Sequence, residues 1–429
     1  MTSNFWPRAT IAASIIASVH AISQLSIRGS KFFTDDGSQF YIKGIAYQLT
    51  PVYPYDPLLD ADQCRRDAEV IKDLGGNAIR VYHVQGSRDH QECMDAFADN
   101  GIYLFVDLDT FDTQIEAKNL YWNETQLDSF TEVLDEFSKY DNTAGVFVGN
   151  EVLTMPIDSN AATYIKAATR DVKAHRDKQD YRKIPVGYSA ADISELRPML
   201  QNYLACGTKP SETADFFGLN AYEWCGDSSF RLSGYNMLQQ NASAYPVPIF
   251  FSETGCNTVP PRDFADLDAI FGDEMADTWS GAIVYEYIQE KNNYGLISYA
   301  AEVDPKTATD APDGFIRSGT PTPISPDYDN LKSRWSTLTP AGIKSADYTP
   351  SNTPPPCPPS TSGVWNVNGD APLPSLGQIA RKVEDSAASA TATAASASAS
   401  KTGSAPGGKE VTGVGVSLVG ILAGMLWWL

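Results

Sequence analysis

The chain has 429 residues, of which 42% are hydrophobic and 20% are charged. This composition is typical of a globular protein and excludes a chain that is disordered throughout. The formal net charge is −21 at pH 7, which excludes nucleic acid or an anionic lipid surface as the main partner because both would repel the chain. A neutral ligand is compatible with this charge, but the charge by itself identifies none.

The first 21 residues have the pattern of a secretory signal peptide. Arg8 supplies the positive charge, residues 9–19 form a short apolar segment, and Val19-His20-Ala21 is a small-residue cleavage site. A buried first helix is the alternative, but the strand pattern of the folded domain begins only after this segment. The pattern therefore predicts that the protein is exported.

Export accounts for the six cysteines, because an even number of them in an oxidising compartment is typical of disulfides. Six cysteines permit many pairings; the residues are Cys64, Cys93, Cys206, Cys225, Cys256 and Cys357. No C-x-x-C pair or Cys/His cluster has the spacing of a zinc site, so we expect no metal and no cofactor. The sequons that begin at Asn123 and Asn241 are candidate glycosylation sites in a secreted protein.

Strand-like and helix-like segments alternate from residue 40 onward. The expected strands cover residues 40–47, 78–84, 102–108, 144–148, 184–188, 216–222, 248–252 and 282–287. The expected helices cover residues 61–74, 91–99, 126–140, 161–178, 194–204, 234–244, 264–276 and 330–338. This alternation predicts an α/β fold, a (β/α)8 TIM barrel with enlarged loops over residues 22–345. A doubly wound sheet would alternate similarly, but no glycine-rich phosphate loop follows the first strand.

The composition changes after the barrel. Residues 346–380 form a Pro-rich extension around Cys357, which we expect to be extended and pinned to the barrel by a disulfide. Residues 381–403 are a Ser/Ala/Thr-rich segment, for which a disordered, O-glycosylated spacer is favoured over the helix that alanine content permits.

The last segment, residues 404–429, resembles the signal for a glycosylphosphatidylinositol (GPI) anchor. Its apolar run, residues 411–429, carries no charge, and small residues precede it by a polar spacer, with Gly403 or Ser404 as the attachment residue. The run is long enough for a retained transmembrane helix, which is the alternative. No basic stop-transfer residues follow it, so we expect a signal that is removed from the mature protein.

Two glutamates occupy the ends of expected strands, where barrel enzymes carry out their chemistry. Glu151 follows the fourth strand and Glu253 follows the seventh, so both side chains can reach the mouth of one barrel. Burying a carboxylate near a core is costly unless it is paired, and each glutamate alone could be an ordinary carboxylate at the rim. Together, with Asn150 before one of them and Tyr222 at the end of the sixth strand, they indicate a retaining glycosidase.

Six motifs resemble one family more closely. They are Val148-Gly149-Asn150-Glu151-Val152, Phe250-Phe251-Ser252-Glu253-Thr254-Gly255, Gly44-Ile45-Ala46-Tyr47-Gln48, Ala78-Ile79-Arg80-Val81-Tyr82, Tyr188-Ser189-Ala190-Ala191-Asp192 and Val284-Tyr285-Glu286-Tyr287. From about Leu25 to Cys357 the chain resembles the fungal 1,3-β-glucanosyltransferases of glycoside hydrolase family 72. The resemblance implies that Glu151 is the proton donor and that Glu253 is the nucleophile. It also implies that Asn150 bonds the 2-hydroxyl of the donor sugar and that Tyr222 donates to Glu253.

Further positions match residues that line the glucan groove in this family, namely Gln48, Tyr82, Asp192, Arg197 and Tyr285, with Tyr294 and Tyr299 as candidates for the acceptor side. Tyr82 and Tyr285 have an alternative reading as aromatics of the barrel wall. The alternative interpretation of Arg197 is a salt bridge with Asp192. His83 is interpreted as a packed or hydrogen-bonded histidine rather than a catalyst.

The resemblance also implies the pairings Cys64–Cys93, Cys206–Cys357 and Cys225–Cys256, and, since no cysteine follows Cys357, the type without the Cys-rich carbohydrate-binding module. The implied activity is cleavage of β-1,3-glucan and transfer of the new reducing end to another glucan chain, at the outer face of the plasma membrane or in the cell wall. Two other functions stay open: an endo-β-1,3-glucanase, which shares the first step, and a non-catalytic cell-wall mannoprotein.

Overall fold

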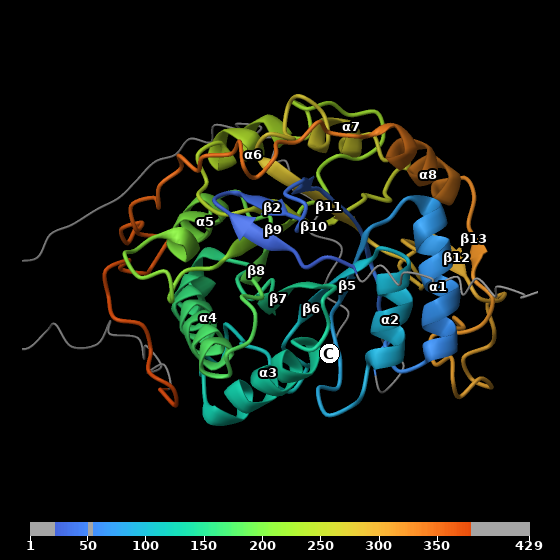
Figure 1. Ribbon diagram of the computed structural model, residues 1–429, viewed down its shortest axis with the longest axis horizontal. Coiled ribbons are helices and arrows are strands. Elements are labelled where there is room, and N and C mark those ends of the chain that lie inside the picture. Colours follow the sequence, from blue (N-terminus) through green and yellow to red (C-terminus); the bar gives the residue numbers. More distant parts are fainter. Residues whose placement is uncertain (1–21, 50–54, 379–429) are drawn as a thin grey trace, which may run out of the picture. The chain divides into compact units, whose positions relative to one another are not determined.

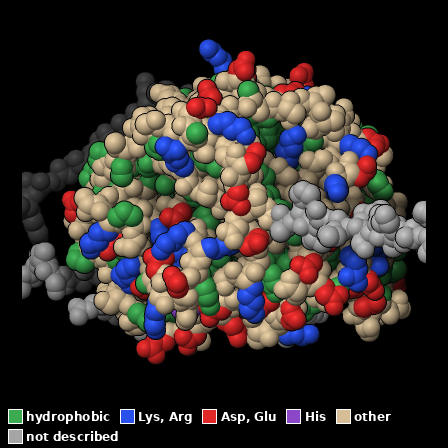
Figure 2. Space-filling view, viewed as in Figure 1, with side chains coloured by type: hydrophobic (Ala, Val, Ile, Leu, Met, Phe, Trp, Pro, Cys, Tyr) green, Lys and Arg blue, Asp and Glu red, His purple; other side chains and the backbone are tan. Residues whose placement is uncertain are grey.

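The computed structural model describes residues 22–49 and 55–378. The expected signal peptide, spacer and anchor signal lie outside these residues. Within them, no helix is long and apolar enough to cross a membrane. Figure 2 shows acidic and basic side chains interspersed with uncharged ones over the face that it presents, which is the pattern of an ordinary solvated surface.

A closed barrel of parallel strands forms the centre of the fold, as the alternation predicted (Figure 1). Each strand pairs with the next along the chain, and the last pairs with the first. Most residues of these strands are apolar and buried, as expected of strands covered by helices on the outside. The strands are β4 (Ile42–Ala46), β5 (Ala78–Val81), β6 (Tyr103–Asp107), β7 (Thr143–Asn150), β8 (Val186–Ala191), β9 (Phe216–Asn220), β10 (Ile249–Thr254) and β11 (Trp279–Val284).

Helices follow the strands and form a ring around them in Figure 1. Asn123 begins one of them with a capping box, in which its side chain accepts from the Gln126 backbone N–H while the Gln126 side chain accepts from Asn123 N–H. The helices are α1 (Ala61–Leu74), α2 (Gln91–Asp99), α3 (Glu124–Phe137), α4 (Ala161–Lys178), α5 (Arg197–Ala205), α6 (Tyr235–Ala242), α7 (Asp266–Ile270) and α8 (Asp327–Thr337), with a 3₁₀ turn η1 (Pro156–Asn160).

Two boundaries differ from the expectation. Helix α7 is shorter than residues 264–276, because Phe264 has a φ of 52° that lies outside the right-handed helical region, and turns replace the helix after Ile270. The expected strand 40–47 is divided at Tyr41, and only its second part, β4, belongs to the barrel.

The first part of that segment belongs to a small antiparallel sheet that the sequence analysis did not predict. It consists of β1 (Ser26–Arg28), β2 (Lys31–Phe33) and β3 (Gln39–Phe40). Its Phe32 side chain is fully buried and packs with ring centroids 6.1–6.3 Å from Phe105, Phe216 and Phe250. These rings come from the starts or middles of barrel strands, so the sheet packs on the end of the barrel opposite the carboxyl ends of the strands.

Three disulfides are present in the expected pairing: Cys64–Cys93, Cys206–Cys357 and Cys225–Cys256. The second joins the end of α5 to the Pro-rich extension. Beyond it, Trp365 is fully buried with its ring 5.6 Å from that of Tyr203, and Gly377 N–H donates to the Trp122 carbonyl at 2.7 Å. The extension is therefore packed against the barrel along much of its length, in agreement with a disulfide-pinned extension. A further pair of strands, β12 (Ile297–Ser298) and β13 (Thr322–Pro323), lies between β11 and α8 in the chain.

Candidate active site

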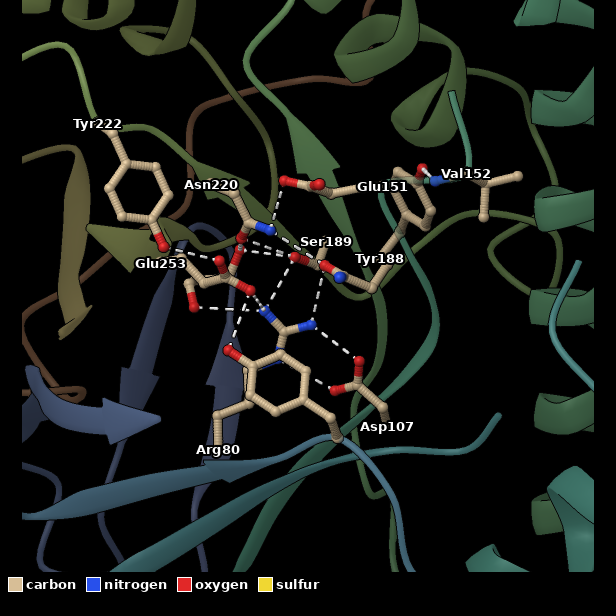
Figure 3. Close-up of polar contacts among 12 residues, drawn as sticks. Arg80, Asp107, Glu151, Val152, Tyr188, Ser189, Asn220, Tyr222 and Glu253 are labelled. Atoms are coloured by element: carbon tan, nitrogen blue, oxygen red, sulfur yellow. Dashed lines mark hydrogen bonds and ion pairs between the residues drawn. The ribbon is translucent and has the colours of Figure 1, made fainter. Parts of the chain in front are cut away.

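Glu151 and Glu253 both lie at the carboxyl ends of barrel strands (Figure 3). Glu151 directly follows β7, and Glu253 is the next-to-last residue of β10, where it pairs in register with Asn220 of β9. Glu151 has a φ of 49°, a strained conformation for a residue with a side chain, and such strain is found most often at functional sites. The turn directs the Glu151 carboxyl group toward Asn220 and the centre of the mouth.

Glu253 is held by three donors. Tyr82 OH donates to Oε1 at 2.9 Å, Tyr222 OH donates to Oε2 at 2.8 Å, and Arg80 Nη1 lies 3.4 Å from Oε1. The residue is 2% exposed. Burial raises the pKa of the Glu253 carboxyl group, the Arg80 charge opposes that rise, and the neighbouring Glu151 charge adds to it, while both tyrosine hydrogen bonds lower the pKa.

Glu151 has a different environment. Asn220 Nδ2 donates to its Oε1 at 2.9 Å, and burial raises the pKa of the Glu151 carboxyl group, against a smaller lowering by Asn220 and Arg80. Two carboxyl groups that share one largely enclosed site do not both ionise easily. Because Glu253 has two hydroxyl donors and the nearer arginine, the arrangement favours an ionised Glu253 and a protonated Glu151, as a retaining mechanism requires.

Arg80 connects the two sides of the site. It belongs to one of the motifs that resemble the family, but no role was predicted for it. It is fully buried and forms two hydrogen bonds with Asp107, at 3.0 and 2.8 Å. It also donates to Ser189 Oγ at 3.1 Å and to Asn150 Oδ1 at 3.1 Å. An arginine between apolar residues of an expected strand requires a buried acidic partner, and this signal was available in the sequence.

Asn220 was not among the predicted site residues. Its Oδ1 accepts hydrogen bonds from Ser189 Oγ at 2.9 Å and Ser252 Oγ at 2.8 Å. This fixes the orientation of its amide, so that Nδ2 points toward Asn150 Oδ1 at 3.0 Å and Glu151 Oε1 at 2.9 Å. An asparagine at the end of the buried strand β9 was a weak signal, since its partners come from other strands.

Four tyrosines surround Glu253 on one side, and we call Tyr82, Tyr222, Tyr285 and Tyr294 the aromatic wall. The ring centroids of Tyr82 and Tyr285 are 6.5 Å apart, those of Tyr285 and Tyr294 are 5.3 Å apart, and those of Tyr294 and Tyr222 are 5.8 Å apart. All three contacts are edge-on, a favourable geometry for aromatic rings. The wall brings together three strand ends and the loop after β11.

Gln48 adjoins this wall. Its Nε2 donates to Tyr285 OH at 2.8 Å and to Glu286 Oε2 at 2.7 Å. Glu286 is fully buried, and burial raises the pKa of its carboxyl group well above the usual value. The structure thus places Gln48 and Tyr285 beside the catalytic candidates, together with a third carboxyl group that the sequence analysis did not single out.

Asp192 and Arg197 lie after β8 and form an ion pair with each other, which is the alternative considered for them. Their location at the carboxyl end of β8 is compatible with a role in the groove, so that role stays a prediction. Tyr299 has a different position: its OH donates to Asp67 of α1 at 2.7 Å, beside Tyr47 and Tyr287. Its hydroxyl group is thus bonded to a helix of the outer layer, and its role on the acceptor side stays a prediction.

His83 packs as expected, with its ring centroid 4.1 Å from that of Phe111, and burial lowers the pKa of its imidazole. The sequon residues Asn123 and Asn241 are both half-buried, at the start of α3 and near the end of α6. Their glycosylation stays a prediction. Within residues 22–49 and 55–378, no group of three or more His, Cys, Asp or Glu side chains is arranged to hold a metal ion.

A barrel that presents a half-buried and a buried glutamate at the ends of its fourth and seventh strands defines a protein of the glycoside hydrolase class. The chain belongs to the glucanosyltransferase family, glycoside hydrolase family 72, whose profile matches residues 14–311. The motifs quoted above thus identified the family correctly.

Among curated relatives, the chain is 41% identical over 360 residues to a 1,3-beta-glucanosyltransferase, gas2, of Schizosaccharomyces pombe, covering 81% of this chain and 74% of that protein. It is 45% identical over 305 residues to protein EPD1 of Candida maltosa. That match covers 70% of this chain and 55% of the relative, so the chain spans little more than half of the relative's length.

Among solved structures, a mutant of Saccharomyces cerevisiae Gas2p in complex with laminaritetraose and laminaripentaose is similar, with a TM-score of 0.73 and 36% sequence identity. The match covers 82% of this chain and 74% of that one. A second structure of the same yeast protein, in complex with a compound, has a TM-score of 0.74 at 37% identity, covering 82% of this chain and 77% of that one.

Proposed function

We propose that the protein is a retaining 1,3-β-glucanosyltransferase. It cleaves β-1,3-glucan and transfers the new reducing end to the non-reducing end of another β-1,3-glucan. The observation that carries the proposal is the pair Glu151 and Glu253 at the carboxyl ends of β7 and β10, with unequal sets of hydrogen-bond donors. Membership of the family and the similarity to a structure that holds laminari-oligosaccharides support β-1,3-glucan as the substrate.

In the first step, Glu253 attacks the anomeric carbon of the donor sugar while Glu151 gives its proton to the leaving glycosidic oxygen. The glycosidic bond breaks, and an ester bond forms between the sugar and Glu253. Tyr222 and Tyr82 orient the attacking carboxylate through their hydroxyl groups. Asn150, whose Oδ1 is held by Arg80 and Asn220, can present its Nδ2 to the 2-hydroxyl of the donor sugar.

In the second step, Glu151 is ionised and removes the proton from a hydroxyl group at the non-reducing end of an acceptor glucan. That oxygen attacks the anomeric carbon, the ester bond to Glu253 breaks, and a longer glucan leaves. Two inversions at one carbon give net retention. The rings of Tyr285 and Tyr294 supply faces on which sugar rings stack, and Gln48, Asp192 and Arg197 supply polar groups for hydroxyls.

An endo-β-1,3-glucanase is the second candidate, because water could take the acceptor's place in the same second step. The family and the named relatives favour transfer. A non-catalytic mannoprotein is a weaker candidate, since it gives no reason for two strained or buried glutamates with matched donors.

We place this activity at the outer face of the plasma membrane, or in the cell wall. The proposal rests on the signal-peptide pattern of residues 1–21 and the GPI-signal pattern of residues 404–429, with Gly403 or Ser404 as the attachment residue.

The test is incubation of the purified protein with a reduced β-1,3-gluco-oligosaccharide together with an unreduced donor, followed by sizing of the products. Transfer gives products longer than either substrate, whereas exclusively shorter products would replace the proposal with hydrolysis. The variants Glu151→Gln and Glu253→Gln are expected to lose at least about a thousandfold in rate, because each removes a group that takes part in bond making or breaking. Normal elongation by either variant would refute the assignment of these residues.

A further inference from the structure

Arg262 lies behind the aromatic wall, in the loop between β10 and α7, and is 3% exposed. Its guanidinium group donates from Nη1 to the Tyr285 carbonyl at 2.8 Å and from Nη2 to the Tyr294 carbonyl at 2.7 Å. The two carbonyl groups belong to the two tyrosines of the wall that are furthest along the chain. A single side chain therefore fixes the backbone at both.

The opposite edge of the same guanidinium group is anchored to α8. Nε donates to Asp327 Oδ2 at 2.7 Å, and the Arg262 backbone N–H donates to Asp327 Oδ1 at 3.2 Å. Asn330 Nδ2 donates to the Arg262 carbonyl at 2.7 Å. These contacts hold Arg262 to a helix outside the barrel, so its fork is a rigid support for the tyrosine backbone rather than a side chain that follows it.

The tip of the loop between Tyr285 and Tyr294 is tied through Asn292, whose Nδ2 donates to Glu286 Oε1 at 2.7 Å, whereas Arg262 holds the backbone at the two ends of the loop. Lys291, Asn292 and Asn293 are exposed, and the Tyr294 ring touches Tyr285 and Tyr222 only by its edge. Arg262 also faces the Tyr294 ring, with its guanidinium carbon 5.8 Å from the ring centroid. Loss of the fork would let Tyr294 shift relative to Tyr222, whose hydroxyl group holds Glu253.

We propose that Arg262 is a positioning residue for the acceptor: it sets the geometry of Tyr285 and Tyr294 and so determines what share of the glycosyl-enzyme is transferred to a sugar rather than to water. The inference rests on the proposed function. Water reaches the ester without a subsite that binds a sugar ring, whereas a sugar hydroxyl reacts only when its ring is bound in register with the ester. A displaced wall therefore costs transfer more than it costs cleavage.

The test variant is Arg262→Lys, which keeps the positive charge but replaces the planar fork by one ammonium group that cannot reproduce the paired bonds to both carbonyls. We expect the acceptor KM to rise and the ratio of transfer to hydrolysis to fall, each about tenfold. The rate of the first step can be measured as the release of the leaving glucan at saturating donor. We expect this rate to change by less than about threefold.

Arg176→Lys is the matched control. Arg176 is 5% exposed, donates to the Ile184 carbonyl at 2.7 Å and lies 3.4 Å from Asp215 Oδ2, but these partners precede β8 and β9 at the other end of the barrel. The Arg176→Lys variant should keep the wild-type ratio of transfer to hydrolysis. The proposal would be overturned if Arg262→Lys left the ratio of transfer to hydrolysis unchanged, or if Arg176→Lys lowered that ratio equally. It would also be overturned if Arg262→Lys lowered the rates of both steps by the same factor.

A binding measurement separates this inference from the proposed function. Calorimetry with laminaripentaose on Glu151→Gln protein, with and without Arg262→Lys, is expected to show about tenfold weaker binding with the second substitution. If the wild-type protein gives only shorter products, the transferase proposal fails, whereas unchanged laminaripentaose affinity overturns the role of Arg262 even if the wild-type protein elongates glucan.

Discussion

Two glutamates with identical side chains have different neighbours, and this difference favours different protonation states. Burial raises the pKa of both carboxyl groups. Their environments differ because Tyr82, Tyr222 and Arg80 contact Glu253 and do not contact Glu151. Hydrogen bonds to a charged acceptor contribute more than those to a neutral one. The proposed division into acid (Glu151) and nucleophile (Glu253) therefore depends on single contacts.

The variant Tyr222→Phe tests this contact. Since the Tyr222 hydrogen bond lowers the pKa of Glu253, its loss raises that pKa further. The nucleophile must be ionised, so the acidic limb of the kcat/KM profile should move to higher pH, by about one unit. A pH–rate profile measures the shift.

Tyr245→Phe is the control for this measurement, because its OH donates to the Gln201 carbonyl outside the barrel mouth. It should leave the acidic limb in place. An acidic limb that does not move in Tyr222→Phe, or that moves equally in both variants, would contradict the role of Tyr222.

At the scale of elements, the barrel separates stability from chemistry by its two ends. The site lies at the carboxyl ends of β5, β7, β9 and β10, whereas the β1–β3 sheet packs near their starts through Phe32. In barrels of this type, the carboxyl-end loops carry function and the opposite end carries stability. Substitutions at the carboxyl end should therefore mainly change activity, and substitutions at the opposite end should mainly change stability.

Phe32→Ala is expected to lower the free energy of unfolding by about 3–5 kcal/mol, since it removes a fully buried ring from a cluster of rings. Urea unfolding measures the loss. The kcat of the remaining folded enzyme should stay within about twofold of wild type, because the substitution lies at the stabilising end of the barrel. A large fall in kcat without a loss of stability would show that the two ends are coupled.

The long elements were predictable from the sequence, and the short ones were not. Strands such as β7 and helices such as α4 carry enough residues to display a period, whereas β1, β2 and β3 have two or three residues each. Their pairing depends on a turn and on packing against rings from β6, β9 and β10. The early end of α7 likewise depends on the conformation of Phe264, which has no periodic signal.

At the scale of the whole molecule, the Cys206–Cys357 disulfide closes a segment with a sequence separation of 151 residues. It joins the extension to α5, and Trp365 and Gly377 continue the packing toward Trp122. A cross-link over so long a segment removes much of the conformational freedom of the unfolded chain.

The double variant Cys206→Ser/Cys357→Ser is expected to lose roughly 5 kcal/mol of unfolding free energy by the chain-entropy argument. Guanidinium unfolding of variant and wild type measures it. The product size distribution should not change, because this disulfide lies on the outside of the barrel. Equal stability of the two proteins would mean that packing around Trp365 alone holds the extension.

The barrel, the strand ends that carry Glu151 and Glu253, and the family to which the motifs belong could all be predicted from the amino-acid sequence. These follow from local periodicity and from short motifs, which neighbouring residues encode. The contacts of Tyr82 and Arg80 with Glu253, of Asn220 with Glu151, and of Arg262 with Tyr285 and Tyr294 became visible only in the folded structure. These contacts join residues far apart in the chain, and they exist because closing the barrel brings the carboxyl ends of its strands to one mouth.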